Sequence, residues 1–121
     1  MKTIVIVDDE RSVRSALSNL LMSEGYTTAL FACAEDLLAD SAALAQAAAF
    51  IIDVRQPGMS GFELFKALTR QLDKPVGIII SGDGDENMLW YAISLGAIAF
   101  LHKPIDIDML LEHIRREVRP G

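Results

Sequence analysis

The sequence predicts a doubly wound α/β domain, in which five parallel strands form one sheet and five helices cover its two faces. Two observations predict this class. Short runs of apolar and often β-branched residues recur along the chain, and segments with helical periodicity separate them. The runs are continuously apolar, which is typical of parallel strands buried on both faces.

The predicted strands are short and mostly stop at a polar residue. Four of them run directly into Asp8, Asp53, Ser81 and the segment 102–104, whereas the run 27–31 is the least apolar. The five predicted strands are 4–7, 27–31, 50–52, 76–80 and 98–101.

The predicted helices lie between these runs. After the first strand, apolar residues from Val13 to Leu21 follow the helical period, and Gly25 ends that helix. The alanine-rich segment 35–49 is expected to be helical, although its limits are vague. The remaining helices are predicted at 62–72, at 86–95 before Gly96, and at 106–118.

Length and composition favour one globular domain and limit what it can bind. The chain has 121 residues, of which 51% are hydrophobic, and this is enough for a single core. Cys33 is the only cysteine, so an internal disulfide and a cysteine metal site are excluded. The net charge of −6 disfavours direct binding of nucleic acid. No stretch could span a membrane or form a signal peptide, so we expect a cytoplasmic location.

Polar residues at four strand ends should meet at one edge of the sheet. Right-handed crossovers place every carboxyl end of a parallel sheet on the same edge, where open α/β sheets hold their chemistry. Three carboxylates, one hydroxyl and one amine are delivered there, from Asp8, Asp9, Asp53, Ser81 and Lys103.

This set of groups predicts phosphoryl chemistry on a carboxylate. Crowded carboxylates repel one another, so at least one pKa should rise unless a hard divalent cation, Mg²⁺ or Mn²⁺, neutralises them. Lys103 can pair with Asp53 in the empty site and with a phosphoryl oxygen in the loaded site. The Ser81 hydroxyl can donate to another phosphoryl oxygen. An aspartate would then be the nucleophile.

Five motifs in register resemble the receiver domain of bacterial two-component response regulators. They are Val7-Asp8-Asp9-Glu10, Asp53 with Pro57-Gly58-Met59-Ser60-Gly61, Ser81-Gly82, Gly96-Ala97 and Lys103-Pro104. The segments 31–36 and 82–85 are most similar to receivers of FixJ-like, LuxR-type regulators. The resemblance covers essentially the whole chain. It implies a CheY-like, flavodoxin-like three-layer sandwich over residues 1–121, with a linker beginning at 118–121.

The resemblance also implies a phosphoacceptor and a metal site. Asp53 corresponds to the phosphoacceptor. Asp9 corresponds to a direct Mg²⁺ ligand, Asp8 to one that acts mainly through water, and the Asp53 carboxylate and the Arg55 backbone carbonyl to further ligands.

Other matched positions would hold the phosphoryl group or respond to it. The amides of Arg55 and Gly82 would point at the phosphoryl group, and Ser81 and Lys103 would bind its oxygens. Phe100 matches a switch aromatic whose inward turn is coupled to the movement of Ser81.

The implied function is a signalling switch with self-directed chemistry, not a turnover enzyme. Its phosphoryl group would come from a histidine kinase or a phosphotransfer protein and would be hydrolysed slowly. The added charge would change the face formed by the fourth helix, fifth strand and fifth helix, residues 86–118. That face would control an output domain or partner, for example in transcription, or a phosphorylation-dependent homodimer, without direct contact to nucleic acid or membrane.

Three alternative functions stay open. A phosphatase of the haloacid dehalogenase type needs an acid where this chain has Arg55. A flavodoxin-like nucleotide binder needs a neutral loop after the first strand, where this chain has Asp8-Asp9-Glu10. The third is a receiver-like interaction module that is never phosphorylated. The retained acids, acceptor and lysine favour the working switch over this module.

Details outside the motifs add three expectations. Arg55 and Asp83 are placed to form an ion pair across the mouth of the site, which would hinder attacking water. Gly77 indicates either a close approach of a helix to its strand or a locally weaker strand. One of Trp90 and Tyr91 should be exposed, as a partner contact or as edge packing.

Overall fold

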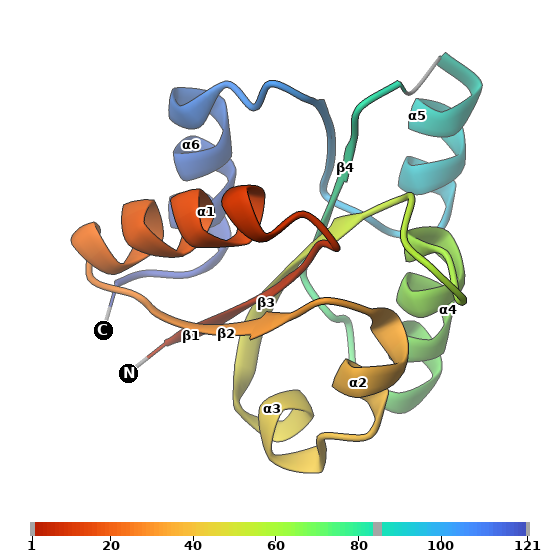
Figure 1. The fold of residues 1–121 in the computed structure, drawn as a ribbon, viewed down its shortest axis with the longest axis horizontal. Helices are drawn as coiled ribbons and strands as arrows, with labels where there is room; N and C mark the ends of the chain where they lie inside the picture. Colours follow the sequence, from red (N-terminus) through yellow and green to blue (C-terminus); the bar gives the residue numbers. More distant parts are fainter. Residues whose placement is uncertain (1, 84–85, 121) are drawn as a thin grey trace.

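The computed structural model describes residues 2–83 and 86–120 (Figure 1). Gly84, Asp85 and Gly121, which belong to the FixJ-like segment and to the predicted linker, lie outside these residues. The described chain forms, in order, β1 (Thr3–Val7), α1 (Arg11–Ser23), β2 (Thr27–Phe31), α2 (Ala34–Leu38), α3 (Ser41–Gln46), β3 (Ala47–Asp53), α4 (Gly61–Gln71), β4 (Gly77–Ser81), α5 (Glu86–Ser94), β5 (Ala99–His102) and α6 (Ile107–Glu117).

The strands form one parallel sheet in the order β2-β1-β3-β4-β5. The chain builds β2 on one side of β1 and then crosses to the other side for the remaining strands. Pairing of Val7 with Ile52, Asp53 with Ile80 and Ser81 with His102 aligns the carboxyl ends of these strands. The strand order reverses between β1 and β3, which is where open α/β sheets hold their ligands.

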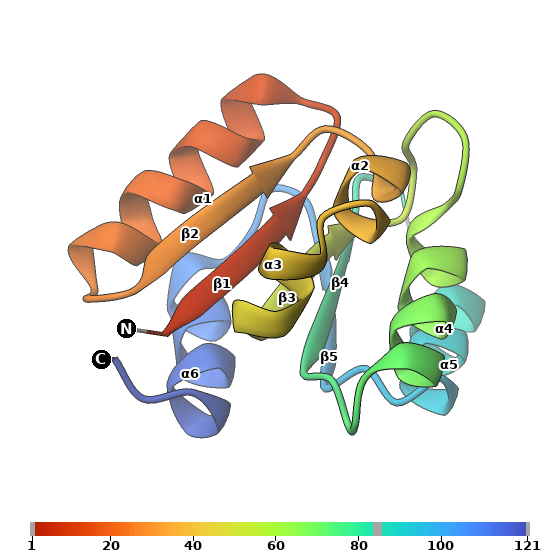
Figure 2. The same cartoon turned by 90° about the horizontal axis from the view of Figure 1, so that it is seen from below.

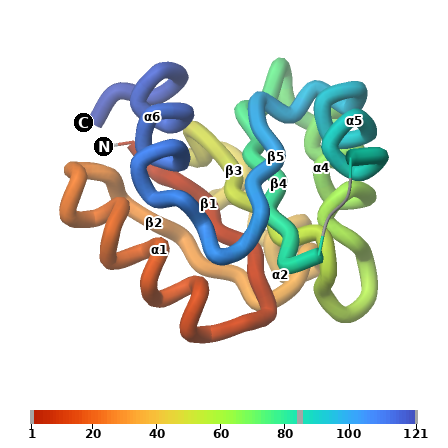
Figure 3. Tube along the Cα trace, turned by 90° about the horizontal axis from the view of Figure 1, so that it is seen from above, coloured from red at the N-terminus to blue at the C-terminus, as the bar shows by residue number. Residues whose placement is uncertain are grey.

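Helices cover both faces of the sheet, as the continuous apolarity of the strands predicts (Figures 2 and 3). Ile4 and Ile6 of β1 face α1 and α6 in one half of the core. Val5 and Val7 alternate with them and face the half covered by α2, α3, α4 and α5. The buried strand residues thus alternate between two apolar layers, one on each face of the sheet.

The alanine-rich segment departs from its expected structure. It forms two short helices instead of one, so the described chain has six helices and not five. Asp40 separates them and accepts a hydrogen bond from the Ala43 amide at the start of α3. Residues 47–49, predicted to be helical, pair with β1 as the start of β3. Alanine itself favours helix, so pairing along the edge of β1 overrides the local preference here.

Close packing between β4 and α4 explains the glycine in that strand. A Cβ atom on Gly77 would lie 2.2 Å from Cε1 of the buried Phe65 ring. The predicted close helix approach is therefore confirmed. The Tyr26 hydroxyl, just before β2, donates a 2.6 Å hydrogen bond to the carbonyl of Val118, just after α6. None of the described helices is long and apolar enough to cross a membrane.

Candidate functional site

The strand ends surround an open cavity at one edge of the sheet. Asp8 follows β1, Asp53 and Ser81 are the last residues of β3 and β4, and Lys103 follows β5. The cavity has a volume of about 420 Å³ and is lined by Asp9, Glu10, Asp53, Arg55, Gly82, Asp83 and Lys103. The structure thus brings together the strand-end residues that the sequence places at this edge.

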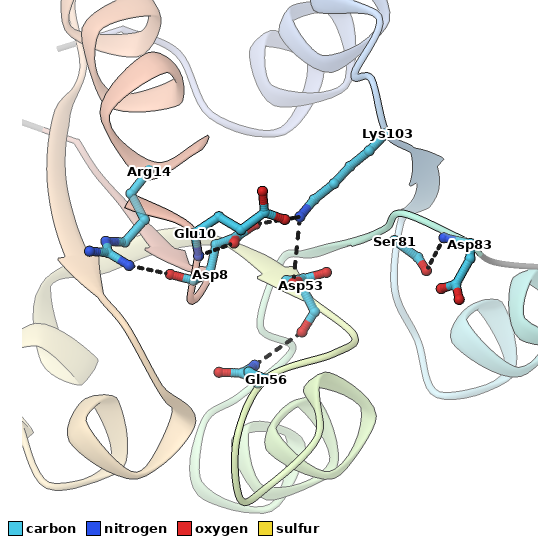
Figure 4. A network of polar contacts seen from close by, with 8 residues as sticks. All are labelled: Asp8, Glu10, Arg14, Asp53, Gln56, Ser81, Asp83 and Lys103. Atoms are coloured by element: carbon cyan, nitrogen blue, oxygen red, sulfur yellow. Dashed lines mark hydrogen bonds and ion pairs between the residues drawn. The ribbon is translucent and has the colours of Figure 1, made fainter. Parts of the chain in front are cut away.

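Two of the carboxylates are buried beneath the opening. Asp8 is fully buried and Asp53 is 4% exposed, whereas Asp9 is exposed. Oδ1 of Asp8 accepts a 2.8 Å hydrogen bond from the Glu10 amide, and Arg14 donates to the Asp8 backbone carbonyl (Figure 4). These bonds hold the turn from β1 into α1, so the position of the Asp8 carboxylate is set by local backbone geometry.

Lys103 lies among three carboxylates. Its Nζ atom is 2.9 Å from Oε1 of Glu10, 3.0 Å from Oδ2 of Asp8 and 3.5 Å from Oδ2 of Asp53 (Figure 4). Burial alone would lower the pKa of Lys103, but its contacts with the carboxylates of Glu10 and Asp8 outweigh burial and raise it. Lys103 is therefore a fixed positive charge. Its expected pairing with Asp53 is present, yet it is the longest of the three contacts.

The pKa of Asp53 is raised above its ordinary value. Burial, and then the negative charge of Asp8, raise its pKa to about 6, although the Lys103 ammonium works in the opposite direction. The expected rise in the pKa of one carboxylate is therefore present, with burial as its larger cause and the crowding of carboxylates as the second. At neutral pH Asp53 is mostly ionised, which is the state that a nucleophilic carboxylate requires.

The oxygen-rich strand end has the chemistry of a site for a hard cation. Oxygen atoms of Asp8, Asp9 and Glu10 lie within 4.8 Å of one another. Oδ2 of Asp8 is buried, and the Lys103 ammonium lies 3.0 Å from it as an ion-pair partner. Carboxylate oxygens are the ligands that a hard cation such as Mg²⁺ prefers.

The loop after β3 is fixed by polar contacts on both sides. The Gln56 side-chain amide donates a 3.0 Å hydrogen bond to the Asp53 carbonyl (Figure 4). Glu35 of α2 accepts a 2.9 Å hydrogen bond from the Met59 amide. Ser60 and Glu63 form a capping box at the start of α4. The loop that contains Arg55 therefore leaves the strand in one defined direction.

The mouth of the cavity is closed on one side by an ion pair. Arg55 Nη2 lies 2.8 Å from Asp83 Oδ2, and both side chains are more than half exposed. The pair has the partners that the sequence predicts. Below it, Ser81 is fully buried, and its Oγ accepts a 3.3 Å hydrogen bond from the Asp83 amide.

The aromatic residues behind the site differ in exposure. Phe100 is buried in the core half covered by α2 to α5, and its ring meets that of His102 edge to face at 5.3 Å. One of Trp90 and Tyr91 of α5 was expected to be exposed, and both are, at 61% and 39%. Tyr91 still packs edge to face on Phe62 of α4.

The contacts of Glu10 and Gln56 cannot be predicted from the positions at which the strands end. Glu10 follows the two aspartates in the sequence, and this run is the only signal for it. Its contact with Lys103 spans 93 positions of the chain. For Gln56 the sequence contains no signal, because its partner is a backbone carbonyl.

Comparison with known proteins identifies the family. Residues 4–115 match the response regulator receiver domain. The response regulator protein TmoT of Ectopseudomonas mendocina is 40% identical over 116 residues, which are 96% of this chain and 52% of TmoT. The transcriptional regulatory protein FixJ of Bradyrhizobium diazoefficiens is 34% identical over 116 residues, 96% of this chain and 56% of FixJ. This chain therefore spans about half the length of these two relatives.

A solved structure supports the fold assignment. The chemotaxis protein CheY4 of Vibrio cholerae is 28% identical and superposes with a TM-score of 0.85, covering 98% of this chain and 99% of CheY4. The CheY-like, flavodoxin-like fold is thus confirmed, as is the resemblance to receivers that include FixJ. The chain belongs to the response regulator receiver domain family of two-component signalling.

Proposed function

We propose that Asp53 is the phosphoacceptor of a two-component switch and is phosphorylated by a histidine kinase or a phosphotransfer protein. Receiver domains act as signalling switches, and this chain belongs to that family. The observation that carries the proposal is the placement of Asp53. Its carboxylate is buried at an open cavity, with the Lys103 ammonium 3.5 Å away.

The proposed reaction transfers the phosphoryl group between two nucleophiles. A carboxylate oxygen of Asp53 forms a bond to phosphorus, while the bond from phosphorus to the donor nitrogen breaks and the donor keeps the electron pair. With acetyl phosphate as donor, acetate leaves instead. Lys103 and the Ser81 hydroxyl would each bind a phosphoryl oxygen, and the amides of Arg55 and Gly82 would point at the group. Attack by water later returns the carboxylate and inorganic phosphate.

A divalent cation, Mg²⁺ or Mn²⁺, fits the proposed site. The carboxylates of Asp8, Asp9 and Asp53 and the backbone carbonyl of Arg55 would hold it, with Asp8 acting mainly through water. The all-oxygen donor set and the buried carboxylate of Asp8 support this assignment. When bound, the cation neutralises charge between the carboxylates and the incoming phosphoryl oxygens.

The proposed output is a change of the surface formed by α5, β5 and α6, residues 86–118. Ser81 would move toward the phosphoryl group, and the aromatic ring of Phe100 would follow it. Exposed Trp90 lies on α5 and is available to a partner or to a second copy in a phosphorylation-dependent homodimer.

The wider role of the protein is part of the same proposal. TmoT is named a response regulator and FixJ a transcriptional regulatory protein, and both are about twice as long as this chain. We place residues 1–121 as one receiver domain, with a linker beginning at 118–121, which controls transcription in the cytoplasm through an output domain. The acidic receiver itself would bind neither nucleic acid nor membrane.

Intact mass after incubation with acetyl phosphate and Mg²⁺ tests the proposal. We expect one phosphoryl adduct on the wild-type chain, and none with Asp53→Asn or after chelation of the cation. A wild-type chain that gains no adduct and also fails to bind beryllofluoride with Mg²⁺ would contradict the proposal. The chain would then be an interaction module that is never phosphorylated.

The ion pair between Arg55 and Asp83 is expected to slow hydrolysis of the phosphoryl group, because it covers one side of the mouth. Arg55→Ala and Asp83→Ala should each speed loss of the adduct by about two- to five-fold, in line with the modest strength of exposed pairs. Adduct decay followed by intact mass measures this rate. If both variants decay at the wild-type rate, the pair does not shield the site.

A further inference from the structure

We infer that Glu10 is a positioning residue that holds the Lys103 ammonium in a resting position away from Asp53. This inference rests on the proposed function, because it concerns the lysine that would bind the phosphoryl group. In the described structure Lys103 contacts Glu10 at 2.9 Å and Asp8 at 3.0 Å, but Asp53 only at 3.5 Å. Two carboxylates thus compete with Asp53 for one ammonium.

Glu10 is the exposed member of this set. Its side chain is 57% exposed, whereas the side chains of Asp8 and Asp53 are 0% and 5% exposed. Water can therefore replace the Glu10 contact at small cost, while Asp8 stays in place beneath the lysine. Among the three contacts, the one to Glu10 is the easiest to break when Lys103 turns toward a phosphoryl oxygen.

The Glu10 carboxylate is committed to this contact rather than to the helix that it begins. Glu10 is the N-cap residue of α1, a position at which the short side chains of Asp, Asn, Ser and Thr commonly accept a hydrogen bond from the first turn. Its side chain makes no such bond, and only its backbone carbonyl accepts from Arg14. Its carboxylate instead reaches across to the residue after β5, 93 positions along the chain.

The Glu10 contact is therefore expected to slow phosphorylation of Asp53, the first step of the switch. For Lys103 to bind a phosphoryl oxygen on Asp53, its contact with Glu10 must open. Glu10→Gln removes the competing charge, and Glu10→Asp keeps the charge but shortens the side chain, so that it no longer reaches Lys103. Both variants should therefore remove the Glu10 contact from Lys103, although only Glu10→Gln changes the net charge.

The first experiment measures the initial rate of adduct formation with acetyl phosphate at saturating Mg²⁺. We expect Glu10→Gln and Glu10→Asp each to be faster than wild type by about two- to five-fold, the range for one exposed ion pair. Glu112→Gln is the matched control, because it removes one exposed carboxylate from α6, outside the cavity lining, and should leave the rate unchanged.

The second experiment observes Lys103 directly in the cation-free protein. The ¹⁵N resonance of its ammonium is expected to shift and to exchange faster with water in both Glu10 variants, but not in Glu112→Gln. Mg²⁺ affinity, measured by calorimetry, should be no weaker in Glu10→Gln than in wild type.

Several results would overturn the inference alone. One is a wild-type rate and an unchanged Lys103 resonance in both Glu10 variants. Another is faster phosphorylation in Glu10→Gln but not in Glu10→Asp, which would reduce the effect to net charge. A third is slower phosphorylation together with weaker Mg²⁺ binding, which would place Glu10 in the cation site. A wild-type chain that accepts no phosphoryl group would overturn the proposed function, and this inference with it.

Discussion

Asp53→Asn is expected to stabilise the folded domain by about 2 to 3 kcal/mol at pH 7.5 when no divalent cation is present. Burial and the charge of Asp8 raise the pKa of Asp53 to about 6 in the folded chain, whereas an unfolded aspartate titrates near ~3.9. Ionised Asp53 therefore costs folding free energy, and each pKa unit corresponds to about 1.4 kcal/mol. The neutral amide removes this cost with almost no change of volume.

The stability difference between wild type and Asp53→Asn is expected to depend on pH. Below about pH 4 the aspartate is protonated in both states and the difference between wild type and variant should vanish. As the pH rises from about 4 to 6, only the unfolded chain releases this proton, so the wild type loses stability relative to the variant. Above about pH 6 the difference should stay constant.

Urea denaturation between pH 4 and pH 8 measures this difference, with Asp73→Asn as the control. Asp73 is an exposed aspartate in the turn before β4, and its replacement should change the unfolding free energy by less than about 0.5 kcal/mol. Mg²⁺ should reduce the stability difference between the variant and wild type, because binding of the cation stabilises the folded wild-type chain. A stability gain by Asp53→Asn that is the same at pH 4 and pH 8 would contradict the prediction.

Gly61→Ala is expected to destabilise the domain by about 3 kcal/mol and to disturb the site at the same time. A Cβ atom at this position would lie 2.3 Å from the carbonyl oxygen of Asp53 and 2.9 Å from Cα of Val54. Both are backbone atoms of the turn out of β3, so neither can rotate away. The amide of Gly61 also donates to the Val54 carbonyl, which holds α4 close to this turn.

The matched control for this change is Gly82→Ala. A Cβ atom on Gly82 would have no neighbour within 4 Å, so the variant should be as stable as wild type or slightly more stable. Urea denaturation compares the two variants through their midpoints at constant slope. If Gly61→Ala unfolds at the wild-type midpoint, the contact between α4 and the end of β3 is looser than the structure shows.

The layout of the candidate site could be predicted because it depends on strand ends. Asp8, Asp53 and Ser81 each stand at the end of a continuous apolar run, and parallel pairing brings such positions to one edge. The two-faced burial of the strands followed from the same runs. The ion pair between Arg55 and Asp83 could also be predicted, since each residue lies two positions after the end of one of two neighbouring strands.

The contacts of Glu10 and Gln56 could not be predicted from the sequence. Glu10 meets Lys103 because of the length and direction of two flexible side chains, which no periodicity encodes. Gln56 bonds to a backbone carbonyl whose orientation depends on the turn after β3. The prediction for the alanine-rich segment 35–49 was wrong for a related reason. Residues 47–49 pair with β1 as the start of β3, and this pairing overrides the local preference of alanine for helix.

By itself, the sequence determined the α/β class, the order of the strands along the chain and the group of residues at the sheet edge. These depend on apolar runs, their polar ends and the handedness of crossovers, which are local or general properties. Only the tertiary structure decided which carboxylate Lys103 contacts most closely and how far burial raises the pKa of Asp53. Both depend on distances of a few ångströms between distant segments and on the water excluded there, and these arise only when the chain is packed.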